Sequence, residues 1–141
     1  MYTRVPEGQD PRFGTVVVAP LDERAAAAAA HGVALVIDCL GAVPVAGFRT
    51  ETRRPSVGSH GWTVADLDGI VALAVPVLRA GGNVLFHCEN GRSRSVVAAC
   101  VTLVALGSHD PESALVAARA RGGMKSRKAR EGYAAWCGGR R

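Results

Sequence analysis

The middle of the chain, residues 83–106, reads NVLFHCENGRSRSVVAACVTLVAL. Apolar residues at 84–86 predict a short buried strand over residues 83–87. A second apolar run predicts a helix from Ser95 to Leu106, ended by Gly107. A loop with Cys88 and Arg94 joins the two elements, so the residues best suited to chemistry lie between a strand and a helix.

Strands and helices are predicted to alternate on both sides of this segment. Residues 15–19 and 33–39 are rich in Val and predict two further buried strands. The first predicted helix covers residues 23–31, with Asp22 as N-cap and Gly32 at its end. A second begins at a Thr63–Asp66 capping box and runs towards Pro76. Two more are predicted, one from Asp110 towards Arg121 and one that follows the basic segment 125–130 and ends near Trp136. Pro76 is expected to kink its helix or end it early. Residues 41–61 lack periodicity and predict a long loop.

This alternation predicts an α/β fold with a mostly parallel central sheet flanked by helices. The 141 residues fit one domain, residues 1–141, with a core at about 13–136. Ligands of parallel sheets bind beyond the carboxyl ends of the strands. The loop that follows His87 is therefore the place to expect a functional site.

Composition and charge narrow the class of protein. Apolar residues make up 48% of the chain and charged residues 21%, as in a globular protein. The formal net charge of +5 favours anionic partners, but no base-reading motif points to nucleic acid. The longest apolar run, 96–106, is too short to span a membrane. No targeting signal is present and the four cysteines lack metal-ligand spacing, so we expect a cytoplasmic, soluble protein with reduced thiols and no metal. The oligomeric state is left open.

The loop residues suit phosphate binding. The candidates that would surround the anion are Glu89, Asn90, Gly91, Arg92, Ser93 and Arg94. Backbone N–H groups at the start of a helix form an anion cradle, and the Arg94 guanidinium would add two parallel donors. This positive field favours the thiolate form of Cys88, which is the nucleophilic form. Ser95 is expected to stabilise the departing thiolate, and His87 to hold the loop through its ring.

Residues 87–95, HCENGRSRS, resemble the HC-x5-R-S signature of cysteine-dependent protein phosphatases, especially the dual-specificity group. The order of elements from about residue 13 to 136 resembles that fold as well. The resemblance implies hydrolysis of phosphate monoesters through a phosphocysteine intermediate, without metal or cofactor. It implies Cys88, Arg94 and Ser95 as catalytic residues, and phosphorylated protein, including phosphotyrosine, as substrate.

The sequence departs from this family at the general acid. The family carries an Asp on a mobile loop before the cysteine, but residues 51–61 contain none. The available substitutes are Asp66, Asp68, His60 and Glu51, and the two Asp residues are better suited to capping a helix. Loss of a general acid typically costs ~10²–10⁴ in rate. An enzyme without one should favour aryl phosphates, whose leaving groups need less help.

Two other functions stay open at this point. A phosphate-binding pseudophosphatase would keep the cradle and turn over slowly or not at all. A phosphoinositide or RNA 5′-phosphate phosphatase would use Arg92 as an extra cation within the loop. The basic segment 125–130 is expected to be a solvated helix face, or to attract an acidic substrate.

Cys39 is a candidate partner for Cys88. It ends the predicted strand 33–39, and Cys88 follows the strand 83–87. Neighbouring parallel strands would bring the two sulfurs to one edge of the sheet, close enough for a disulfide. A buried structural role for Cys39 is the alternative. The segment around Cys39 resembles, locally, tensin-like phosphoinositide phosphatases, in which a cysteine at the corresponding strand end protects the nucleophile.

Overall fold

The computed structural model describes residues 3–118, 124 and 126–139. Its elements, in chain order, are β1 (Val16–Ala19), the 3-10 turn η1 (Leu21–Glu23), α1 (Arg24–Ala30), β2 (Val33–Asp38), β3 (Thr50–Thr52), α2 (Val64–Arg79), β4 (Asn83–His87), α3 (Arg94–Leu106), α4 (Pro111–Ala118) and α5 (Arg127–Gly138). This order confirms the predicted α/β class.

The four strands form one sheet in the order β1-β4-β2-β3, and every pairing between them is parallel. β4 lies in the interior of the sheet, with Phe86 opposite Val18 on one side and Ile37 on the other. The strands therefore end at a common carboxyl edge. The loop after His87 leaves the sheet at the centre of that edge.

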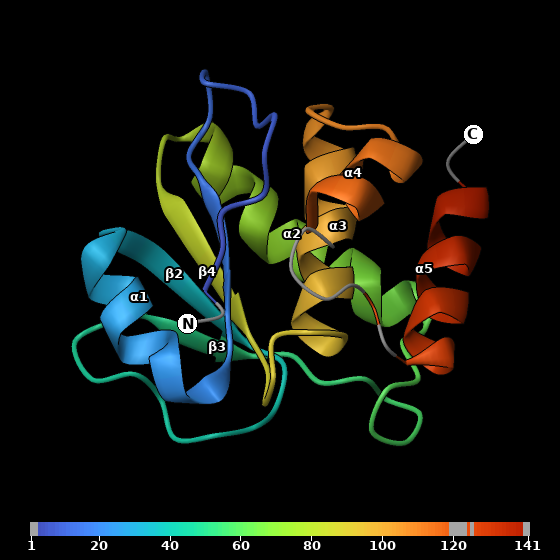
Figure 1. Cartoon of the computed structure of the whole chain (residues 1–141), viewed down its shortest axis with the longest axis horizontal. Coiled ribbons are helices and arrows are strands. Elements are labelled where there is room, and N and C mark those ends of the chain that lie inside the picture. Colours follow the sequence, from blue (N-terminus) through green and yellow to red (C-terminus); the bar gives the residue numbers. More distant parts are fainter. Residues whose placement is uncertain (1–2, 119–123, 125, 140–141) are drawn as a thin grey trace.

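Helices cover both faces of the sheet, as Figure 1 shows, with α1 on one side and α2 to α5 on the other. Side chains alternate between the two faces: Val17 and Leu85 pack with α1, whereas Val18 and Phe86 pack with α2 and α3. The face towards α2 to α5 carries the larger of the two apolar cores. α3 is buried along most of its length and contacts α2, α4 and α5, so the first turn of α3 is held at a fixed position below the loop.

Several predicted signals are confirmed. The Thr63–Asp66 capping box begins α2, and the Asp110 carboxylate accepts a hydrogen bond from the Ser113 backbone at the start of α4. Gly107 ends α3 in the left-handed conformation, with φ of 82°. The predicted end of the α4 helix near Arg121 lies outside the described residues.

Other predictions are wrong in detail. Asp22 does not cap α1, because it lies within η1 and its side chain makes no capping hydrogen bond. Pro76 does not end α2, because it lies in the last turn and the helix continues to Arg79. The predicted loop 41–61 contains the short edge strand β3, paired with β2. Cys39 follows β2 and is not part of it.

Gly14 allows the chain to approach β4 closely before β1 begins. Its backbone N–H donates to Leu78 O, and a Cβ there would lie 1.8 Å from Gly82 O. We predict that Gly14→Ala lowers the free energy of unfolding by about 1–3 kcal/mol, because backbone atoms cannot yield as a side chain does.

Gly69→Ala in α2 is the matched control, since nothing lies within 4 Å of its Cβ position. The control should gain about 0.5–1 kcal/mol. Denaturant unfolding measures both, and equal changes would contradict the prediction.

Candidate active site

The loop between β4 and α3 forms one wall of a cavity of about 300 Å³. The residues that line this cavity come from the loop, from the segment before α2 and from the start of α5: His60, Cys88, Asn90, Arg92, Ser93, Arg94 and Ser126. Of the predicted site residues, Cys88, Asn90, Arg92, Ser93 and Arg94 are therefore brought together in one place. Ser95 lies directly behind them.

Cys88 and Ser95 form a buried pair at the base of the cavity. The Cys88 side chain is 2% exposed, and its Sγ lies 3.1 Å from Ser95 Oγ. Ser95 is in the first turn of α3, where its hydroxyl is held beneath the loop. A hydroxyl at this distance can donate a hydrogen bond to a thiolate, which is the contact expected of a group that stabilises a departing sulfur.

Arg94 projects a guanidinium that is mostly buried yet incompletely paired. Its Nε is buried and has no hydrogen-bond partner among the described residues. Its nearest carboxylate, Glu89 Oε2, lies 3.9 Å from Nη2, and the Glu89 side chain is 64% exposed. A buried donor without an acceptor is costly unless a ligand completes it. The cavity therefore has the character of an anion site.

The loop backbone turns at Gly91, where φ is +66°. A Cβ at this position would lie 3.1 Å from the carbonyl carbon of Ala19, so both the dihedral angle and the close approach favour glycine. Arg4 fixes the same residue from the other side. Its Nη2 donates to Gly91 O at 2.6 Å, and its Nε donates to Ala118 O at 2.9 Å.

Two further contacts hold the loop at its ends. The Leu21 N–H donates to Glu89 O at 2.9 Å, and the Ser126 N–H donates to Ser93 Oγ at 3.0 Å. The first contact ties the loop to η1 and the second ties it to the start of α5. Neither Arg4 nor Ser126 was predicted from the sequence, because nothing in the order of residues shows which distant segments meet the loop.

The His87 ring makes no well-formed hydrogen bond to the loop among the described residues. The ring is buried, and neither nitrogen has a hydrogen-bond partner among the described residues. Nε2 lies 3.6 Å from Asp38 Oδ1. This distance allows an electrostatic interaction but is too long for a hydrogen bond. Burial lowers the pKa of His87, although Asp38 opposes this shift. The Asp38 carboxylate accepts hydrogen bonds from the backbone N–H groups of Leu40, Gly41 and Ala42, and so orders the turn after β2.

The carboxylates proposed as general acid are engaged elsewhere. Asp66 Oδ2 accepts hydrogen bonds from the Thr63 and Ser56 backbones and from Ser56 Oγ. Burial raises the pKa of Asp66, but these hydrogen bonds outweigh it and the net shift is downward. Asp68 accepts from the indole of Trp136. Glu51 lies on β3 beside Arg53, and none of the three lines the cavity.

His60 is the one candidate acid that lines the cavity among the described residues. Its Nδ1 lies 2.8 Å from Ser59 Oγ. Burial, followed by the positive charge of Arg94, lowers the pKa of His60 from its usual value of 6.5. His60 and Arg94 both line the cavity.

Comparison with known proteins gives a consistent fold and no close relative. No protein-family model and no curated protein sequence matches the chain. Among solved structures, PTPMT1 in complex with PI(5)P matches with a TM-score of 0.77 and 17% identity, covering 99% of this chain and 96% of that one. Human DUSP28 matches with a TM-score of 0.74 and 18% identity, covering 96% and 93%. Tk-PTP in the active form matches with a TM-score of 0.73 and 17% identity, covering 98% and 99%.

The chain has the fold of the dual-specificity and tyrosine phosphatases. In this phosphatase fold the cavity lies at the carboxyl edge of the sheet, at the end of β4. Within residues 3–118, 124 and 126–139, no group of three or more His, Cys, Asp or Glu side chains could hold a metal ion. No described helix has the length and apolar character needed to cross a membrane.

The contact of Arg4 with Gly91 generates a prediction about phosphate affinity. Arg4→Met leaves Gly91 O and Ala118 O without this donor, and should lower the free energy of unfolding by about 1–3 kcal/mol. Because Gly91 belongs to the loop, phosphate should also bind more weakly. Arg12→Met is the control, since the Arg12 side chain is 77% exposed. Chemical denaturation and inhibition by phosphate measure the two effects. A variant with reduced stability and unchanged phosphate inhibition would show that Arg4 supports the fold without shaping the loop.

Cys39 and Cys88 directly follow the neighbouring strands β2 and β4. Asp38 is the register partner of His87, the Cys39 N–H donates to His87 O, and both thiols are free and buried. Burial, with a smaller contribution from Cys88, raises the pKa of Cys39. Burial therefore favours the protonated form of Cys39.

We predict that one equivalent of peroxide converts the two thiols to a Cys39–Cys88 disulfide, releasing two molecules of water. Activity should be lost and then recovered with a dithiol. With excess peroxide, Cys39→Ser should recover less activity than the wild type, because without a resolving thiol the Cys88 sulfenic acid is oxidised further to a sulfinic acid that a dithiol does not reduce. Peptide mapping identifies the pair, and a link from Cys88 to Cys100 or Cys137 would refute the prediction.

Proposed function

We propose that the protein is a cysteine-dependent phosphatase that hydrolyses phosphate monoesters through a phosphocysteine intermediate. The observation that carries this proposal is the buried, unpartnered Arg94 Nε in the cavity that also contains Cys88. A nucleophile and an incompletely paired guanidinium in one cavity suit a tetrahedral oxyanion. The phosphatase fold around the cavity agrees with this function.

In the first step, the Cys88 thiolate attacks the phosphorus atom opposite the leaving oxygen. The S–P bond forms as the P–O bond to the leaving group breaks. Arg94 and the loop N–H groups stabilise the charge on the three remaining oxygens. In the second step, water attacks the phosphorus, the S–P bond breaks, and Ser95 Oγ, 3.1 Å from Sγ, donates to the returning thiolate.

We propose a phosphorylated protein, with phosphotyrosine foremost, as the substrate. A second hollow adjoins the first and shares Asn90 and Arg92 with it, but Asp22 and Glu89 also line it. Two carboxylates beside one guanidinium disfavour a second phosphate group. This charge balance argues against a substrate with several phosphates, such as a multiply phosphorylated phosphoinositide or an RNA 5′-polyphosphate end.

A monophosphorylated lipid headgroup is the second candidate, because the solved structure of PTPMT1 contains PI(5)P. α5 presents Arg127, Lys128 and Arg130 at its exposed start, beside the cavity-lining Ser126. Arg127 is paired with Glu131, and Arg130 donates to Met124 O. Lys125 of the predicted basic segment lies outside the described residues. Rates on a phosphotyrosine peptide and on a short-chain phosphatidylinositol phosphate compare the two candidates directly.

The first functional prediction concerns the nucleophile and the clamp. Cys88→Ser should abolish turnover of an aryl phosphate, and Arg94→Lys should lose at least ~10²-fold, because lysine cannot form the two parallel hydrogen bonds. Vanadate should inhibit the wild type and bind Arg94→Lys more weakly. Arg127→Lys is the matched control on an exposed arginine. Steady-state kinetics and thermal unfolding of each variant are the measurements.

A phosphate-binding pseudophosphatase predicts a different result. The wild type would then bind phosphate and vanadate but release no product above the Cys88→Ser background. Full activity in Cys88→Ser would refute the nucleophile itself.

A further inference from the structure

A histidine faces the phosphate cavity from a segment that the catalytic signature does not include. His60 lies before α2, distant in sequence from Cys88, yet both side chains line the same cavity. The three carboxylates that could have served as acid are engaged elsewhere. Asp66 accepts hydrogen bonds from Ser56 and Thr63, and Asp68 accepts one from Trp136. Glu51 lies beside Arg53. His60 is therefore the candidate proton donor that can reach a bound substrate.

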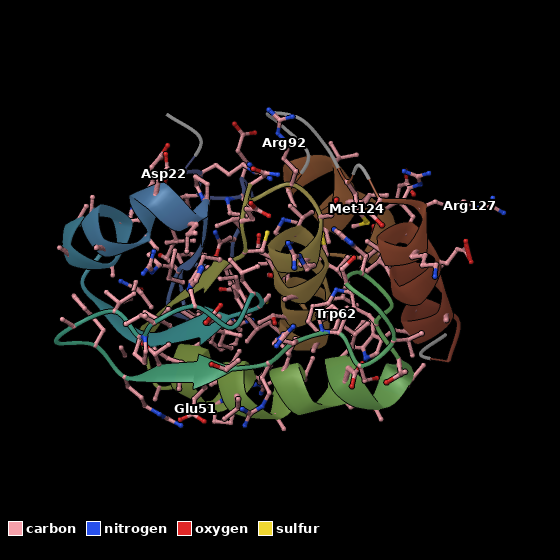
Figure 2. The ribbon with its side chains drawn as sticks, turned by 90° about the horizontal axis from the view of Figure 1, so that it is seen from below. Asp22, Glu51, Trp62, Arg92, Met124 and Arg127 are labelled. Atoms are coloured by element: carbon pink, nitrogen blue, oxygen red, sulfur yellow. The ribbon has the colours of Figure 1, made fainter. Side chains whose placement is uncertain are left out.

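The segment that carries His60 is fixed at both ends. Val57 and Gly61 exchange two backbone hydrogen bonds of 3.1 and 2.9 Å, which close a short turn with His60 near its tip. Trp62 follows directly and is 5% exposed. Figure 2 shows Trp62 between the loop and α5, and a Cβ on Gly132 of α5 would lie 2.9 Å from Trp62 O. The backbone beside His60 thus packs closely against a helix.

The two ring nitrogens of His60 have different surroundings. Nδ1 lies 2.8 Å from Ser59 Oγ, so the serine can accept a hydrogen bond from Nδ1–H. Nε2 makes no hydrogen bond within the described part of the chain. With Nδ1 held by Ser59, Nε2 is the nitrogen left to exchange a proton with a ligand.

The geometry points to His60 as the general acid and base of the proposed phosphatase reaction, taking the place of the Asp that residues 51–61 lack. In the first step, protonated Nε2 gives its proton to the leaving oxygen as the P–O bond breaks, so an alcohol or phenol departs. In the second step, neutral Nε2 takes a proton from the attacking water as the S–P bond breaks. Phosphate and the Cys88 thiolate are released, and His60 is again protonated.

The charges around His60 set the pH range of this role. Burial lowers the pKa of His60, and the positive charge of Arg94 acts in the same direction. The charged and titratable groups that face the cavity or flank the turn are Cys88, Arg92 and Arg94 of the loop, Asp66 of α2, and Lys128 and Glu131 of α5. Because the pKa of free His60 is below 6.5, its acid form is lost as the pH rises through that lower value. Help to the leaving group is therefore greatest at acidic pH.

The test compares two substrates that differ in leaving group. 4-Nitrophenyl phosphate releases a good leaving group, which needs little protonation, whereas phenyl phosphate releases a poor one. At the acidic end of the pH profile, where His60 is protonated, His60→Ala should lower kcat/KM for phenyl phosphate by ~10²-fold and for 4-nitrophenyl phosphate by less than ~10-fold. At about pH 8, wild type and variant should differ little on either substrate. The pKa of His60 is below 6.5, so the wild-type imidazole is neutral at that pH.

Two additional variants separate a chemical role from a structural one. His60→Asp supplies a carboxylic acid, whose pKa is lower than that of an imidazole. This variant should recover part of the rate on phenyl phosphate, and its activity should fall with rising pH at a lower pH than in the wild type. His31→Ala, a histidine that does not line the cavity, is the matched control. Vanadate inhibition and thermal unfolding should be nearly the same in His60→Ala and wild type.

The outcomes are distinct. An equal loss on both substrates at every pH, with weaker vanadate binding, would mean that His60 shapes the cavity and donates no proton, and would overturn this inference. An unchanged pH profile and leaving-group dependence in His60→Ala would overturn it as well. Both results would leave the phosphatase proposal intact, because that proposal fails if Cys88→Ser retains the activity of the wild type or if the wild type releases no product above the Cys88→Ser background.

Discussion

The parallel pairing of β4 with both β1 and β2 is the constraint on which the site depends. An interior strand is fixed on two sides, so the residue that follows it leaves the sheet at a position that cannot drift. That residue is Cys88. α3 then begins at Arg94 and is buried along its length, so the chain must turn back within the few residues between the two elements. Gly91, with its positive φ and its close approach to Ala19, makes that turn possible.

The strand–loop–helix unit was predictable because its signals are local. An apolar run, a glycine-containing loop and a second apolar run with a terminal Gly107 each follow from short-range backbone preferences. The details that failed depend on the context of the fold. β3 is a three-residue, polar edge strand that exists through its pairing with β2. Asp22 lies in a 3-10 turn that replaces the expected first turn of α1.

The sequence could not choose among the four candidate acids, because sequence proximity is a poor guide to which side chain enters a cavity. Asp66 has the right chemistry, but its carboxylate is committed to the capping box and to Ser56. His60 enters the cavity because the turn 57–61 closes and Trp62 packs inward against α5. Arg4 and Ser126 illustrate the same point at the loop itself, since they reach it from the two ends of the described chain. Only the assembled fold brings such residues together.

The hollow beside the cavity has a consequence for the design of inhibitors. Arg92 separates an anion-binding cavity from a hollow lined by Asp22 and Glu89, and Figure 2 shows Asp22 and Arg92 at the same rim. A compound with a phosphonate at one end and an ammonium group on a short arm would match both charges at once. A phosphonate alone would engage only the loop to which the proposed function assigns phosphate binding. The ammonium arm would instead address the carboxylates of Asp22 and Glu89, which lie outside the oxyanion site.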